Sequence, residues 1–569
     1  MNSDKKFQMK FTNGLPLEKS MYPGLDEHTY TVKAGSIQKA GAKPLPVDIQ
    51  VDQNTQIPLR DGTIIRADIY RPTTGENFPT IMWYAPYGKR GSFLNMDNFN
   101  HPTRMDVPTT WEDGLNSFEA PNPSDWVKHG YVVISPDPRG VGSSEGNAYA
   151  WGSQQATDEY DVIEWIGEQP WSNGKVGLTG TSYLAMSQYA VAELQPSHLA
   201  AIAPWEGAFN PYKESLARGG IADTSFNASL SSAIFTNNQV EDMATLGQEH
   251  PFYDAYWQDK TPDLHKVTIP AYLVGSWTNA VHSLGSYKAF DQLGSTEKWL
   301  RVHNTHEWND YYNPENVADL RKFFDRYLKG IDNGWEETPK VRLSVLNPGH
   351  ADIINRPEKK YPLDHSENET FHLAQQDNDF VLQKNPQQSK GSVSYDADAS
   401  EGVTFKLKIP TATEIVGELS LKLYVEAADN DDMDLFAFVR KLDAEGNPLE
   451  PQVVTDRPYP GPNGRLRVSM RKLDPNESNN HHLELAQTNP EKLKTGEVVA
   501  VTIPFWPFGM KWEAGETLAL TIGPKDKIVR PEFPQLPPSP NINHGRHIIH
   551  FGGNFDAKLT LPKINLNNQ

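Results

Sequence analysis

The chain has 569 residues, about twice the length at which a single hydrophobic core stops growing, so we expect two or three domains. Its net charge of −20 disfavours nucleic acids and anionic membranes as partners, and the lack of cysteine excludes disulfides, thiolate metal ligands and a cysteine nucleophile. The polar N-terminus has no apolar signal segment and no run reaches membrane-spanning length, so we expect a cytoplasmic protein.

The first segment, residues 1–48, shows no clear periodicity. We interpret it as an arm that packs on the surface or on a partner subunit, which leaves a homo-oligomer as one alternative. A hairpin is expected next, with strands at 57–60 and 64–70 joined by a turn at Asp61-Gly62.

Strands and helices then alternate along the chain. Buried strands are expected at 79–85, 131–135, 176–179, 199–204, 267–275 and 298–303, and helices at 157–168, 183–194, 282–293 and 318–329. This order predicts a mostly parallel sheet over 49–206 and 267–338, with helices on both faces. Functional sites in such sheets lie at the carboxyl ends of the strands. Residues 207–266 contain Gly, Asn and Ser breaks between short helical patterns, which indicates an inserted helical cap.

From about residue 339 the apolar period changes to two. Val403, Phe405 and Leu407 alternate with polar residues, and Leu421, Leu423 and Val425 do the same in a later segment. Half-buried strands separated by Pro and Gly turns predict a β-sandwich over 339–567.

The segment 175–184 combines a short apolar strand with the start of a helix, and the two meet at Ser182. This pattern indicates a nucleophile elbow, because a serine held at such a turn exposes its hydroxyl next to a helix N-terminus. The usual second glycine of that motif is replaced by Leu184.

Several separate motifs carry a family resemblance. They are Asp61-Gly62, Pro86-Tyr87-Gly88-Lys89, Asp137 with Arg139-Gly140, Pro170-Trp171-Ser172-Asn173-Gly174, Gly180-Thr181-Ser182-Tyr183, Gly275-Ser276-Trp277 and Phe324-Asp325. Together they resemble the cocaine-esterase-like (CocE/NonD) hydrolases, relatives of the X-Pro dipeptidyl-peptidases and the α-amino-acid ester hydrolases. The resemblance implies an α/β-hydrolase domain, a helical cap and a C-terminal jelly roll.

The same resemblance implies a catalytic set without a cofactor or metal. Ser182 would be the nucleophile, and the backbone N–H of Tyr183 and the phenol of Tyr87 would form the oxyanion hole. His306 would be the general base, with His303 as the alternative. Asp137 and Arg139 are interpreted as bracing residues.

The sequence departs from the family where the catalytic acid is expected, because Asn279 stands there. An Asn can orient the base but brings no charge to it. Glu206, after the preceding strand, is a candidate replacement for the acid. If nothing replaces it, a catalytically impaired binding protein on a hydrolase scaffold is the alternative.

The substrate class is inferred from the neighbouring residues. Carboxylates that hold a substrate ammonium in the ester hydrolases correspond here to Val281 and His282, while Trp205, Trp277 and Trp308 suit an apolar acyl group. We therefore expect a serine hydrolase of small esters or amides, with an X-Pro-type dipeptidyl aminopeptidase as the alternative.

Overall fold

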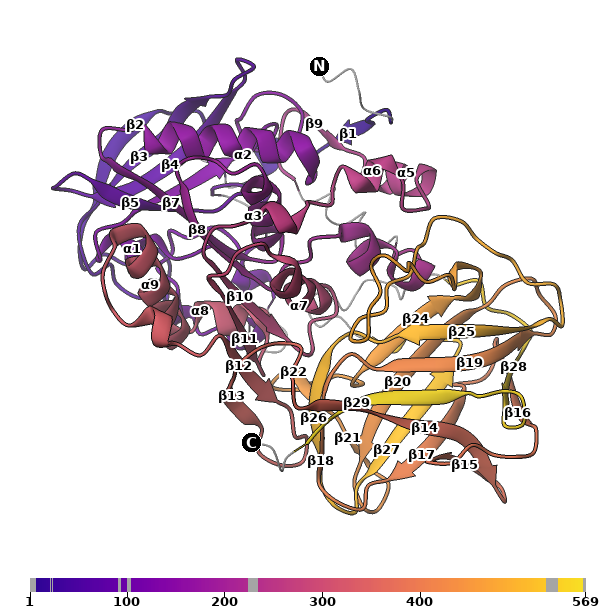
Figure 1. Cartoon of the computed structure of the whole chain (residues 1–569). Helices are drawn as coiled ribbons and strands as arrows, with labels where there is room; N and C mark the ends of the chain where they lie inside the picture. Colours follow the sequence, from indigo (N-terminus) through magenta and orange to yellow (C-terminus); the bar gives the residue numbers. More distant parts are fainter. Residues whose placement is uncertain are drawn as a thin grey trace.

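The computed structural model describes residues 7–20, 22, 24–90, 94–99, 104–223, 234–528 and 541–565. Figure 1 shows two bodies side by side, an N-terminal one built on a sheet with helices and a C-terminal one built of strands. Within the described ranges, no helix combines the length and the apolar character that crossing a membrane requires.

The N-terminal body contains an 11-stranded mixed sheet in the order β13-β12-β11-β10-β8-β7-β5-β6-β4-β3-β2. Its strands are β2 (His28–Val32), β3 (Ile49–Pro58), β4 (Ile64–Pro72), β5 (Phe78–Met82), β6 (Val132–Asp137), β7 (Ser172–Thr181), β8 (Leu199–Trp205), β10 (Ala271–Ser276), β11 (Lys298–His303), β12 (Val341–Val345) and β13 (Ile353–Glu358). The strands from β6 to β12 in this order pair in parallel, and the strands at both edges pair antiparallel. The expected mostly parallel sheet and the β3–β4 hairpin are therefore confirmed.

Helices cover both faces of this sheet. They are α1 (Pro123–Val127), α2 (Gly152–Gly167), α3 (Tyr183–Glu193), α7 (Ser283–Gln292), α8 (Glu307–Tyr312) and α9 (Pro314–Lys329). One apolar cluster joins α2, α3 and α7 to the sheet, and a second joins α1, α8 and α9 to it. The strongly amphipathic pattern of α9 buries Leu320, Phe323, Phe324 and Leu328 in the second cluster.

Two boundaries differ from the sequence prediction. The arm packs on its own chain, because β2 extends the sheet along β3 and β1 (Phe11–Asn13) pairs with β9 (Gln239–Glu241). The sheet also continues past residue 338, since β12 and β13 belong to it. The change of period did not mark the boundary, because β12 is buried on both faces and β13 is a largely polar edge strand.

Segment 207–266, predicted as a helical cap, contains short elements in its described part. They are the π-helical turn η5 (Tyr212–Leu216), the turn η6 (Arg218–Gly220), β9, α5 (Met243–Glu249) and α6 (Ala255–Gln258). Residues 224–233 of this segment lie outside the described residues. Arg218 bonds both the side chain and the backbone of Asn463, so the segment contacts the C-terminal body.

The C-terminal body is a domain rich in β-strands. Its network of 14 strands comprises β14 (Ser366–Gln376), β15 (Asp379–Gln383), β16 (Gly391–Asp396), β17 (Val403–Lys408), β18 (Thr413–Gly417), β19 (Ser420–Ala427), β20 (Asp434–Leu442), β21 (Pro448–Leu449), β24 (Asn463–Arg467), β25 (Val498–Pro504), β26 (Phe508–Trp512), β27 (Thr517–Gly523), β28 (Arg546–Phe551) and β29 (Lys558–Ile564). In β19 every second residue from Leu421 to Ala427 is buried, as its period predicts.

The two bodies share apolar contacts at Trp277, which follows β10. Its ring stacks on Tyr287 of α7 with centroids 4.8 Å apart and an interplanar angle of 6°. Gly509 of β26, in the C-terminal body, also lies against the indole, because an added Cβ there would come within 2.6 Å of it. Glycine is thus required at 509, because the indole occupies the space of any side chain there.

Candidate active site

Ser182 sits at a sharp turn between β7 and α3, as the elbow motif predicts. Its φ of 61° and ψ of −123° are strained for a residue with a side chain, and strain of this kind is typical of functional turns. Its backbone N–H points to the carbonyls of Trp205 and Glu206 at 3.3 and 3.1 Å, which hold the turn against the end of β8.

Leu184, in the place of the motif's second glycine, is fully buried. A Cβ on Gly180 would lie 2.3 Å from the Cβ of Leu184, and Gly180 has a φ of 145°. The leucine is accommodated because Gly180 has no side chain. The departure from the motif therefore leaves the elbow intact.

The imidazole nearest to the nucleophile belongs to His282. Its Nε2 lies 3.0 Å from Ser182 Oγ, within hydrogen-bonding distance. The ring is 5% exposed and stands at the N-cap of α7, the helix that follows the loop after β10. The sequence analysis did not consider His282 as a candidate base. The available signal was its position three residues after Asn279, in the loop where the family places its acid.

Asn279 shapes the turn that carries His282. Its Oδ1 accepts the backbone N–H groups of Val281 and His282 at 2.9 and 3.0 Å, and its Nδ2 donates to Glu307 Oε2 at 2.7 Å. All polar atoms of this side chain are engaged in holding the loop. Asn279 thus acts on the backbone of His282, whereas the sequence comparison expected it to contact a base directly.

His306, the predicted base, caps α8. Its Nδ1 accepts the backbone N–H of Trp308 at 3.2 Å. The bond to Ser182 Oγ is made by His282, and the role of His306 as base stays a prediction.

His303 and Glu206 form a buried pair. His303 Nε2 lies 2.7 Å from Glu206 Oε1, while its Nδ1 accepts from the N–H of Thr305 at 3.3 Å. Both ring nitrogens are therefore engaged away from Ser182. Glu206, the candidate replacement acid, contacts His303, and its backbone carbonyl supports Ser182.

Tyr87 and Tyr183 lie beside the nucleophile. Burial, together with the nearby Glu119 carboxylate, raises the pKa of the Tyr87 phenol well above its usual value, while Ser182 beside it acts in the opposite sense. The Tyr183 side chain turns to Gln155 Oε1 at 2.6 Å. Its backbone N–H is the first of α3, where helix N–H groups have no partner within the helix.

Glu119 was also missed by the sequence reasoning. It is 2% exposed, and its Oε1 accepts the indole N–H of Trp308 at 3.0 Å. This carboxylate and Trp308 therefore border the Tyr87 phenol. No local pattern marks Glu119, because it stands in an irregular segment before α1.

Trp205 and Trp277 are placed away from an open acyl site. Trp205 is 1% exposed, packs edge to face on Tyr272 and Tyr311, and lies under the Arg301 guanidinium. Trp277 stacks on Tyr287 and lies against the backbone of β26. Of the three tryptophan side chains, that of Trp308 bonds to Glu119 next to Tyr87, while Trp205 meets Ser182 through its backbone carbonyl.

The loop that carries Tyr87 is anchored by a buried ion pair, as the bracing role of Asp137 predicts. Asp137 accepts from the backbone N–H of Lys89 at 2.7 Å and from its ammonium at 2.9 Å, and both side chains are fully buried. The Tyr22 hydroxyl of the arm adds a bond to Asp137 at 2.8 Å. Arg139 braces α2 through Asp158 at 2.7 Å.

The sequence and fold are similar to those of known proteins, and these similarities identify the family. The chain matches the X-Pro dipeptidyl-peptidase (S15 family) model over residues 61–243 and the X-Pro dipeptidyl-peptidase C-terminal non-catalytic domain over residues 333–560. A crystal structure of a CocE/NonD family hydrolase from Staphylococcus aureus is 32% identical, with a TM-score of 0.88 and 99% of both chains covered. The chain belongs to the CocE/NonD hydrolase family.

Other relatives of this CocE/NonD hydrolase carry different names. A cocaine esterase from Rhodococcus is 25% identical over 52% of the chain and 58% of the relative. A putative Xaa-Pro dipeptidyl-peptidase from Bacillus anthracis is 25% identical over 58% of the chain and 60% of the relative, so the chain spans about three-fifths of both. An α-amino acid ester hydrolase shares the fold, with a TM-score of 0.66, 16% identity and coverage of 90% and 96%. The relatives are serine hydrolases named for esters in some cases and peptides in others.

Proposed function

We propose that this CocE/NonD hydrolase cleaves small esters or amides through an acyl-enzyme on Ser182, with His282 as the general base. The observation that carries the proposal is the 3.0 Å contact between His282 Nε2 and Ser182 Oγ at a strained strand-to-helix turn. A serine hydroxyl is a weak nucleophile until a base in hydrogen-bonding reach removes its proton.

The proposed reaction has two halves. His282 takes the hydroxyl proton while Ser182 Oγ attacks the carbonyl carbon, and the carbonyl oxygen becomes an anion facing the N–H of Tyr183 and the phenol of Tyr87. The anion collapses, the bond to the leaving alcohol or amine breaks, and His282 returns the proton to the leaving group. Water then repeats the sequence on the acyl-enzyme and releases the acid.

We infer a preference for neutral acyl groups. The loop position next to Ser182 carries an imidazole, which is the base, and Val281 adds no charge. A buried ammonium without a partner costs several kcal/mol. The alternative, an X-Pro-type aminopeptidase, is favoured by one observation, the buried carboxylate of Glu119 beside Tyr87.

We also infer the finer architecture. The antiparallel pairing of β14 with β29 and of β17 with β27 supports a jelly roll for the C-terminal domain. Segment 207–266 follows β8 directly after Glu206 and touches the β-rich domain at Asn463, which supports its role as a cap over the nucleophile.

The two histidines can be separated by matched variants. We expect His282→Gln to lower kcat for p-nitrophenyl butyrate by about 10²–10⁴, the usual contribution of a general base, and His306→Gln to lower it far less. The rate of labelling by a fluorophosphonate probe should fall in parallel, with Ser182→Ala as the unlabelled control. The reverse order of the two variants would return the base to His306.

The same probe tests the alternative that the chain is a catalytically impaired binding protein, which the Asn279 in place of the acid suggested. A folded wild-type protein that neither takes up the probe nor hydrolyses the ester contradicts the proposal and favours a binding role. The substrate class is decided by comparing kcat/KM for p-nitrophenyl butyrate and glycyl-prolyl p-nitroanilide. Preference for the second substrate would establish the aminopeptidase.

A further inference from the structure

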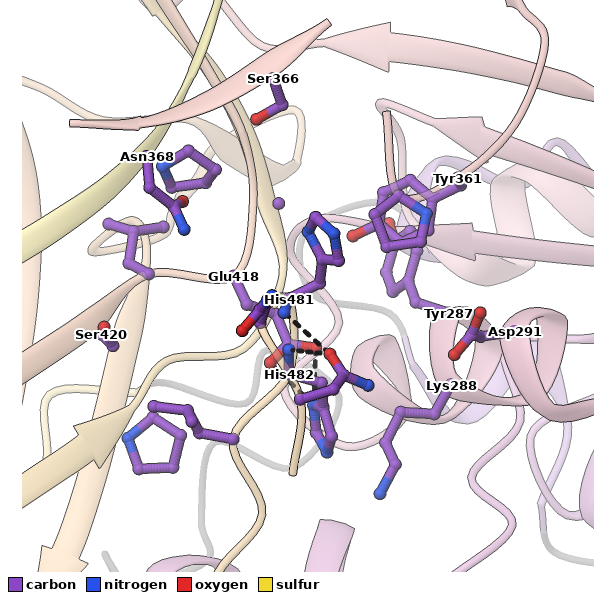
Figure 2. Close-up of a pocket in the computed structure, with 18 of the residues that line it drawn as sticks. Tyr287, Lys288, Asp291, Tyr361, Ser366, Asn368, Glu418, Ser420, His481 and His482 are labelled. Carbon is purple, nitrogen blue, oxygen red and sulfur yellow. Dashed lines mark hydrogen bonds and ion pairs between the residues drawn. The ribbon is translucent and has the colours of Figure 1, made fainter. Parts of the chain in front are cut away.

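A cavity lies where the β-rich domain meets α7. Its volume is about 580 Å³, which falls in the range of roughly 300–1,000 Å³ that small-molecule sites occupy. Its lining comes from the second half of α7, residues 361–368, the turn between β18 and β19 and residues 477–483 (Figure 2). Pro504 of β25 and Thr560 and Pro562 of β29 complete it. Ser182, His282 and Tyr87 are not among the lining residues, so this cavity is separate from the candidate active site.

The charged groups at its base compensate one another. His482 Nδ1 lies 2.8 Å from Glu418 and its Nε2 lies 3.0 Å from Glu484, while the Lys288 ammonium lies 2.5 Å from Glu484. Burial lowers the pKa of His482, but the two carboxylates outweigh it and raise the pKa to about 9. The ring is therefore charged at neutral pH. The Lys213 ammonium also lies 3.6 Å from Glu484, so three cations surround the two carboxylates. Both carboxylates are therefore already compensated by groups of the protein.

Neutral polar side chains line much of the remaining wall. They come from separate segments: Ser366 and Asn368 of β14, Ser420 of β19, Gln292 of α7, and Asn480. In the described part of the chain, none of these five side chains has a hydrogen-bond partner. Figure 2 shows Asn368 and Ser420 on one side of the cavity and Tyr287, Tyr361 and Asp291 on the other. Amides and hydroxyls both donate and accept, so they can bind hydroxyl groups in either sense.

The ring of Tyr361 supplies an apolar surface opposite Asn368 and Ser420, whereas Tyr287 behind it is only 2% exposed (Figure 2). The rings of Tyr287 and Tyr361 lie 5.3 Å apart at 40°. Tyr287 is held in place because Trp277 stacks on it and its hydroxyl donates to Ser276 O at 3.1 Å. A fixed aromatic surface favours binding, since little side-chain freedom is lost when a ligand packs on it.

We propose that this cavity binds a neutral saccharide of one or two rings. The C–H face of a sugar ring would pack on Tyr361, and its hydroxyls would bond the amide and hydroxyl groups of the lining. Asp291 and Glu477 can accept from further hydroxyls. An organic cation could use these two carboxylates and the rings, but it would leave the amides and hydroxyls without partners, so the lining favours the saccharide.

The test is calorimetric titration of the full chain with maltose, cellobiose and N,N′-diacetylchitobiose, and with spermidine as a cationic probe. We expect at least one disaccharide to bind. Asn368→Ala and Tyr361→Ala should each weaken that binding by about tenfold, the loss typical of one well-placed contact. Asn385→Ala, at an exposed asparagine outside the lining, is the matched control and should bind like the wild type.

Three results would overturn the proposal: no disaccharide binds the wild type, binding survives both cavity variants, or spermidine binds while the disaccharides do not. Hydrolysis of p-nitrophenyl butyrate by Asn368→Ala should equal that of the wild type, which shows that the variant is folded. Since binding is measured without turnover, this test is independent of the proposed esterase function.

Discussion

The Tyr87 phenol has one proton and two neighbours that compete for it. It lies beside Ser182 and the Glu119 carboxylate, and both affect the pKa of the phenol. While Glu119 is ionised the proton is held toward the carboxylate, because a bond to a charged acceptor is stronger than a neutral one by about 1–1.5 kcal/mol.

In Glu119→Gln, the amide oxygen can keep the bond to Trp308 while the amide nitrogen donates to the phenol oxygen. The phenol proton is then free for the oxyanion, and we expect kcat to rise about tenfold, since 1.36 kcal/mol corresponds to a factor of ten.

The assay is hydrolysis of p-nitrophenyl butyrate by Glu119→Gln, Tyr87→Phe and the double variant. Tyr87→Phe alone should lower kcat by about 10²–10³, the usual loss for one oxyanion donor. In the Tyr87→Phe variant, the further change Glu119→Gln should leave kcat unchanged, because the phenol proton is absent. The reasoning is refuted if Glu119→Gln lowers kcat as much as Tyr87→Phe, or if its effect is unchanged in the double variant.

Three further outcomes follow from the contacts around the site. Glu206→Gln should destabilise the protein by about 3 kcal/mol through the broken pair with His303, and thermal unfolding together with an unchanged kcat of the folded fraction would distinguish this from a catalytic role. Asn279→Asp should lower kcat, because a carboxylate would replace the amide that donates to Glu307; a rise in kcat would mean that only the acid was missing. The raised pKa of His482, about 9 against 6.5, gives a stabilisation of about 3 kcal/mol that is complete below pH 6.5 and is lost as the pH rises through 9. Urea unfolding across this range should show the loss in the wild type and not in His482→Gln.

The sequence predicted those parts of the fold that local period controls. The spacing of apolar residues predicts the strand before Ser182, the helix after it and the alternation in β19, and all three are present in the structure. The polar edge strand β2 carries no such period and was missed. β2 forms by pairing with β3, and the residues of β2 alone do not indicate that partner.

The active site was predictable only in part. Ser182 and Tyr87 follow strands and come from motifs, so their positions could be inferred. The approach of His282 to Ser182 depends on how Asn279 folds the loop between β10 and α7, which is a set of hydrogen bonds and not a spacing. Trp205 and Trp277 were predicted as binding residues because burial by distant segments of the chain cannot be seen in their own segments.

The packing of the Trp277 indole bears on whether the N-terminal body can fold without the C-terminal one. The indole stacks on Tyr287 of its own body and lies against Gly509 of the other, so the interface there is packed like the inside of a single core. A fragment ending before β14 would expose this ring to water and lose the bodies' mutual support. The family model names the C-terminal part non-catalytic, yet the helix that begins at His282 rests on it. The two parts should therefore melt as one cooperative unit, and a hydrolase shortened to its first sheet should not remain folded.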